Sequence, residues 1–274
     1  MLEILLLFRE ALYGTLVVGV TCGLLGVWVV LRRIVFVGAA LAQVSSAGIA
    51  LAILLAGMGL SVGLAGDPLA LSIAITLLFA LFFGLGGRQR VVPADAVLGV
   101  TYAVAGAVGV LLISKAAAGE AHDLYLHGNI LGLTRRDLWI ALTVSIPLLL
   151  LHLIFYKEFL FVSYDSETAR TLGYRVQRWN LLLYFTLGLV IAVGIQSAGV
   201  LVVFNFLVLP AVTGLLLART MRGVFAVAAV ASAVAVVGGF AASIPFDLPT
   251  GSAIIATSGV LVLLAGTARR LRVA

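Results

Sequence analysis

Apolar runs long enough to cross a membrane recur along the whole chain and constrain its fold more than any other feature. Each run holds about 18 to 22 residues, which crosses a hydrocarbon core of roughly 30 Å when helical. The 274-residue sequence is 63% hydrophobic and 10% charged, whereas soluble proteins are about half apolar and a quarter charged. The sequence therefore predicts an all-α, polytopic transmembrane helical bundle in which residues 1–274 form a single transmembrane domain.

Breakers between the apolar runs predict about nine membrane spans. Their approximate ranges are 10–31, 35–57, 68–87, 96–114, 138–156, 179–197, 199–218, 223–244 and 250–268. The joint at 196–199 is short, so an eight-span alternative stays open in which two runs form one broken helix. Small residues such as Gly19, Gly23 and Gly26 are spaced to let helix backbones pack closely in lipid.

Basic residues cluster at alternate ends of successive spans. Arg32 and Arg33, the segment 157–178, Arg219 and Arg222, and residues 269–272 all fall on one side, which the positive-inside rule makes the cytoplasm. The N-terminus is then outside and the C-terminus inside. The net charge of +6 thus reflects topology, and we expect no nucleic-acid partner.

Several function classes are disfavoured by what the sequence lacks. No glycine-rich phosphate loop is present, so any ATP would bind another chain and this chain would hold no cofactor of its own. The acids fall near span ends or in loops, which weakens a proton- or sodium-coupled carrier. Catalytic groups are too dispersed for an enzyme. The single cysteine, Cys22, lies within an apolar run and is interpreted as a packing residue.

The longest loop on the predicted cytoplasmic side, 156–179, contains the signals of a short helix. Asp165 or Ser166 would cap it, Glu167 lies in its first turn and Gly173 would end it. Such a helix at the membrane face suits docking to a cytoplasmic partner. The alternative is an ordinary interfacial helix anchored by Trp179 and arginines.

Six segments, in order along nearly the whole chain, resemble the zinc/manganese permease family of ATP-binding-cassette importers. They are LRRIVFVGAALA, PADAVLG, HGNILGLTRRDL, the D-x-x-x-A-x-x-L-G pattern at 165–173, SAGVLVVFNFLVLPA and DLPTGSAII. The resemblance implies a type II importer-like permease in a bacterial or archaeal plasma membrane. Its implied partners are a second copy of itself, cytoplasmic ATPase subunits and an extracytoplasmic solute-binding protein.

By this resemblance, the loop at 165–173 would couple the permease to its ATPase. The residues assigned to that contact are Asp165, Glu167, Ala169, Arg170, Leu172 and Gly173. The resemblance further implies an alternating-access permease for zinc or manganese that is not itself an enzyme. Three rivals stay open: the same fold with an altered or non-metal substrate, a scaffold that no longer transports, and a secondary carrier.

One segment departs from the family pattern. Relatives typically read G-D-A-L-S-H where this chain has Ala39 in the Asp position and Gln43 in the His position. Ala39, Gln43 and Ser46 share a helical face, which by resemblance lines the transport pathway. Amide and hydroxyl oxygens are neutral, weaker ligands than carboxylate and imidazole. Alternatively, these polar groups only bond to neighbouring helices.

Further polar residues extend the prediction. Asn205 is assigned to the pathway and is expected to approach Gln43 across the bundle, and Pro210 is expected to kink its helix. His122 and His127 are weak metal candidates in an outer loop, with simple solvation as the alternative. His152, within a span, is interpreted as a hydrogen-bonded packing residue.

Overall fold

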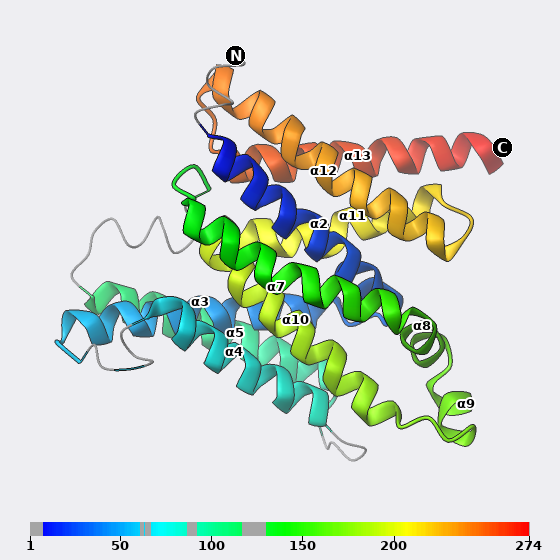
Figure 1. The fold of residues 1–274 in the computed structure, drawn as a ribbon, viewed down its shortest axis with the longest axis horizontal. Coiled ribbons are helices and arrows are strands. Elements are labelled where there is room, and N and C mark those ends of the chain that lie inside the picture. Colours follow the sequence, from blue (N-terminus) through cyan, green and yellow to red (C-terminus); the bar gives the residue numbers. More distant parts are fainter. Residues whose placement is uncertain (1–7, 61–62, 64–66, 87–91, 117–129, 274) are drawn as a thin grey trace.

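The computed structural model describes residues 8–60, 63, 67–86, 92–116 and 130–273, and all regular secondary structure among them is helical (Figure 1). The helices are α2 (Arg9–Leu31), α3 (Val35–Gly57), α4 (Pro68–Leu85), α5 (Ala94–Lys115), α7 (Arg135–Ile154), α8 (Tyr156–Tyr164), α9 (Ser166–Thr171), α10 (Val176–Ala198), α11 (Val200–Leu217), α12 (Met221–Phe246) and α13 (Thr250–Val273).

Within the described ranges, nine helices are long and apolar enough to cross a membrane, as the sequence predicted. The joint between α10 and α11 consists of Gly199 alone, whose φ of 81° lies in the region that glycine tolerates. Each flanking helix has spanning length, so the structure favours nine spans over eight. The predicted ranges agree closely, although α13 continues to Val273 and α4 ends at Leu85.

The helices form a bundle with a buried centre and three outer members. In their spanning segments, 67% of α2 and 67% of α10 residues are buried, against 17% in α5 and 22% in both α7 and α13. α2 packs on α7, α11 and α12, while α3 packs on α4, α5 and α10. Large side chains such as Trp28, Phe206 and Ile191 fill the space between them. Cys22 is fully buried, which confirms its predicted packing role.

Side-chain caps mark the start of some of the spans, including α4 and α7. The Asp67 side chain accepts a hydrogen bond from the Leu69 backbone N–H, and Pro68 occupies the first turn of α4. Thr134 and Asp137 form a capping box at the start of α7. α11 runs through the buried Pro210 as one continuous helix.

Close helix contacts depend on glycine, as the small-residue spacing predicted. A Cβ on Gly26 would collide with the Leu207 carbonyl of α11, and one on Gly23 would collide with the Ser232 hydroxyl of α12. In lipid, apolar burial gives little drive for helices to associate, so backbone approach at such positions supplies much of the packing energy.

We predict that Gly26→Ala destabilises the bundle by about 1–3 kcal/mol, because the methyl group forces α2 away from α11. The matched control is Gly259→Ala in α13, where a new Cβ meets nothing within 4 Å. Thermal unfolding of the purified protein in detergent checks the pair. Equal melting temperatures for the two variants would contradict this account of the α2–α11 contact.

Candidate coupling segment and transport pathway

The predicted short helix exists as α9, and Asp165 is its cap. The Asp165 carboxylate accepts a hydrogen bond from the Thr168 backbone N–H at 2.9 Å and another from the Thr168 hydroxyl. These bonds hold the pKa of Asp165 below its usual value. Because the folded-state pKa is lowered, the cap stabilises α9 while Asp165 is ionised, and this contribution is lost as pH falls through the lowered pKa.

The segment 165–173 divides into an inward anchor and an outward surface. Ala169 is fully buried against Val162 and Val176, so its side chain positions the loop and is not available to a partner. Leu172, in contrast, is 66% exposed although it is apolar. Gly173 follows with φ at 86° and ends the helix as predicted. The segment's remaining predicted contact residues, Asp165, Glu167 and Arg170, are also exposed.

Arg32, in the turn between α2 and α3, connects this segment to the rest of the bundle. Its Nε donates to the Ser163 hydroxyl of α8 at 2.7 Å, and its Nη1 donates to the Asn180 side-chain oxygen of α10 at 2.6 Å. Burial lowers the pKa of Arg32 to about 10, so the guanidinium stays charged at neutral pH. α8 leads directly into α9, so one partly buried cation joins both flanks of the candidate coupling segment to the start of α3.

Sequence reasoning missed this role of Arg32. The topology argument explained a basic residue at the end of a span, and nothing in the spacing pointed to Ser163 or Asn180. The two hydrogen bonds join residues 131 and 148 positions apart, a separation that only the folded structure reveals.

The polar face of α3 lies inside the bundle rather than on lipid. Gln43 is half-buried, and its side-chain oxygen lies opposite Gly106 of α5. Ser45 is bound to Ser72 of α4 at 2.8 Å, which makes it a helix-packing residue. Ser46 is 1% exposed, and its hydroxyl has no hydrogen-bond partner within the described ranges. Buried hydroxyls normally have a hydrogen-bond partner, so Ser46 is an exception among the described residues.

The predicted pairing of Asn205 with Gln43 is wrong. The Asn205 amide nitrogen donates to the Ser258 hydroxyl of α13 at 3.0 Å, and its oxygen has no partner among the described residues. The physical reason is the direction of the two side chains. α11 does contact α3, where Leu207 lies against Gly38, but Asn205 is directed to α13 and Gln43 to α5. Asn205 is nonetheless buried, as an amide in a membrane must be.

The predictions made for the three histidines have different outcomes. His152 is buried, its Nε2 lies 3.0 Å from the Thr186 hydroxyl and its ring stacks on Phe159, which confirms the predicted packing role. His122 and His127 lie outside the described residues. No group of three His, Cys, Asp or Glu side chains that could hold a metal occurs in the part of the chain that was described.

Comparisons with known proteins agree with this architecture. A family model described as the ABC 3 transport family matches residues 5–269. The chain is 30% identical to the manganese import system permease protein ScaB of Streptococcus gordonii, covering 93% of this chain and 89% of that protein. It is 28% identical to the manganese transport system membrane protein MntC of Halalkalibacterium halodurans, covering 94% and 85%.

A solved structure, PsaBC from Streptococcus pneumoniae in complex with Fab, is similar with a TM-score of 0.80. The identity is 29%, and the match covers 94% of this chain and 90% of that one. The nine spanning helices among the described residues, the capped segment at 165–173 and the family match over nearly the full length agree with one another. The chain belongs to the ABC 3 transport family.

Proposed function

We propose that this chain is the membrane-spanning permease subunit of an ATP-driven importer for a divalent metal ion, manganese before zinc. The observation that carries the proposal is similarity over more than nine tenths of the chain to permeases named for manganese transport. The chain would work as a homodimer in a bacterial or archaeal plasma membrane. A separate ATPase would bind and hydrolyse ATP, and an extracytoplasmic binding protein would deliver the ion.

The exposed surface of segment 165–173 supports docking of that ATPase. Leu172 offers an apolar contact, flanked by the exposed charges of Glu167 and Arg170. Buried Ala169 and the Asp165 cap hold the surface in one shape. A small, rigid and partly apolar surface such as that of segment 165–173 is suited to a protein interface, because little conformational entropy is lost on binding.

Arg32 would link the docking surface of segment 165–173 to α3, the helix that carries the proposed pathway residues. When the ATPase moves α9, α8 moves with it, and the bonds of Arg32 to Ser163 and Asn180 transmit the displacement to the first turn of α3. Alternating access would then follow from a shift of α3 relative to α5. A charge buried on neutral partners alone is costly, and a role in transmission explains why such a residue is tolerated.

The pathway would be lined by Gln43 and Ser46 of α3, with Asn205 as a further predicted member that is directed to α13. Oxygen ligands suit Mn²⁺, and Ser46 Oγ and Asn205 Oδ1 are both buried without partners. With Ala39 and Gln43 in place of an acid and an imidazole, we propose transient binding of the ion by neutral oxygens.

His122 and His127 would pass the ion inward from the binding protein. An altered substrate, a non-transporting scaffold or a secondary carrier are the competing functions.

The first prediction concerns docking. Leu172→Asp should weaken copurification of the cognate ATPase by about tenfold or more, because it places a charge in the apolar centre of the contact. Leu248→Asp is the matched control, since Leu248 is also exposed outside a helix but lies at the opposite end of α12. Undiminished ATPase binding by Leu172→Asp would refute the docking role.

The second prediction concerns the cargo. Vesicles containing this chain, its ATPase and its binding protein should take up radiolabelled Mn²⁺ when ATP is supplied. Gln43→Ala should raise the half-saturating Mn²⁺ concentration about tenfold, the cost of losing one polar partner of a charged group. Ser45→Ala is the control, because Ser45 is engaged by Ser72. Uptake without the ATPase would instead indicate a secondary carrier, and no uptake of any divalent metal would remove the metal assignment.

The third prediction concerns transmission. Arg32→Gln should leave ATPase binding intact while reducing Mn²⁺ transported per ATP hydrolysed about fivefold or more, because two hydrogen bonds to α8 and α10 are lost. Arg32→Lys should also be impaired, since an ammonium cannot reproduce the guanidinium fork. The control is Arg33→Gln, an exposed neighbour in the same turn. If Arg32→Gln and Arg32→Lys both transport as much Mn²⁺ per ATP hydrolysed as wild type, Arg32 has a structural role only.

A further inference from the structure

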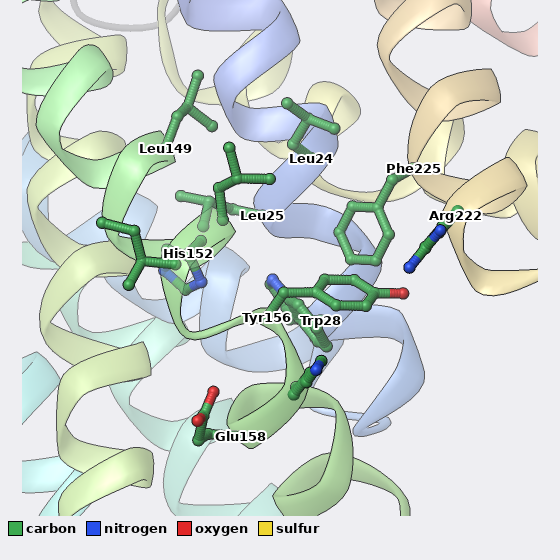
Figure 2. Close-up of a pocket in the computed structure, with 12 residues that line it drawn as sticks. Leu24, Leu25, Trp28, Leu149, His152, Tyr156, Glu158, Arg222 and Phe225 are labelled. Carbon is green, nitrogen blue, oxygen red and sulfur yellow. The ribbon is translucent and has the colours of Figure 1, made fainter.

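A cavity of about 830 Å³ lies at the end of the bundle that is predicted to face the cytoplasm (Figure 2). It is bounded by α2, α7, α8 and α12. Both α7 and α12 pack against α2, which leaves a space between them with α2 as its floor. The pathway helix α3 contributes no residue to it. The cavity is therefore separate from the candidate pathway.

The walls of the cavity are apolar where they lie within the membrane spans. Leu25 and Trp28 of α2 are almost completely buried beneath it, and Leu149 of α7 and Phe225 of α12 face each other across it. Leu153, beside them on α7, is 71% exposed. Because α7 is an outer helix of the bundle, this side of the cavity opens toward lipid.

The opposite end of the cavity is polar and lies where the spans end. α7 ends at Ile154 and α12 begins at Met221. Tyr156 and Lys157 in the first turn of α8, and Arg222 in the first turn of α12, line this end of the cavity. Figure 2 shows the Tyr156 hydroxyl directed toward the Arg222 guanidinium. Both cations are exposed. Glu158 lies on the far wall, so the two cations exceed the single acid by one charge.

An occupant must match both ends of the cavity. A free anion would leave the leucine and aromatic walls facing water, and an apolar molecule would leave two cations without a counter-charge. A molecule with an acyl chain and an anionic phosphate satisfies both ends. We propose that this cavity binds one phospholipid, with an acyl chain between α7 and α12 and the headgroup phosphate between Lys157 and Arg222.

Phospholipid binding at this cavity is a property separate from transport, and it can be tested without a transport assay. The full-length chain is purified in detergent, stripped of lipid and supplied with phosphatidylethanolamine or phosphatidylglycerol, and retained lipid is measured by native mass spectrometry. Wild type should retain one phospholipid of either kind, since both carry the phosphate. The Lys157→Gln, Arg222→Gln double variant should retain at least about tenfold less phospholipid than wild type. The reason is that each cation near an anionic headgroup strengthens lipid binding.

Two further variants separate the site from general effects of charge or folding. Arg33→Gln, Arg219→Gln removes two exposed arginines at the same end of the bundle that do not line the cavity, and it should retain lipid normally. Leu149→Trp should fill the apolar part while keeping both cations and should also lose lipid. Thermal unfolding in detergent checks that each variant is folded.

Several outcomes would overturn the proposal. Equal lipid retention by wild type and the Lys157→Gln, Arg222→Gln variant would show that the cations hold no headgroup. Displacement of the lipid by inorganic phosphate would identify a free anion as the ligand. A change of oligomeric state in the Leu149→Trp variant, with no lipid retained by wild type, would place a second copy of the chain in the cavity instead.

Discussion

Close approach of helix backbones in lipid is the constraint on which the rest of this structure depends. Water is absent, so burial of leucine or valine gives little net drive for helices to associate, and packing must come from short contacts. Glycines at the α2–α11, α2–α12 and α12–α13 crossings provide them, because a Cβ on Gly26, Gly23 or Gly239 would collide with the facing helix. The same contacts fix α2 and α11 at the centre and leave α5, α7 and α13 outside, where lipid or a partner subunit can reach them.

Polar side chains in this bundle separate into two groups under that constraint. Ser45 with Ser72 and His152 with Thr186 are paired across neighbouring helices, so they serve packing. Other buried side-chain atoms have no partner among the described residues, including Ser46 Oγ, Asn205 Oδ1, Thr15 Oγ1 and the second ring nitrogen of His152. An unsatisfied group in lipid costs free energy, so a functional reason for its presence is needed. For Ser46 and Asn205, the proposed cation pathway would be such a reason, because a passing ion or its water would bind these oxygens.

Local patterns predicted much of this architecture because they depend on nearby residues. The nine spans, the Asp165 cap and the Gly173 stop follow from hydropathy, capping and backbone preference, which act over a few residues. Contacts between distant segments could not be predicted this way. Nothing near Asn205 indicates Ser258, and the buried position of Ala169 within an otherwise exposed loop depends on Val162 and Val176 folding over it. The family pattern pointed to this loop but did not distinguish its buried anchor, Ala169, from its exposed surface.

Helix α8 is the element at which the proposed activities meet. Its first turn supplies Tyr156 and Lys157 to the lipid cavity, its middle holds Phe159 against His152 and Trp179, and its end presents Ser163 to Arg32. α8 has nine residues and buries Phe159 and Val162, and close-packed interiors transmit strain, so a displacement at one end of α8 would be expected to reach the other end. A phospholipid at its start and an ATPase at the segment that follows its end would therefore act on the same body. The lipid composition of the membrane would then influence the position of α8 before each ATP-driven conformational change. This coupling would require no contact between the lipid and the transported ion.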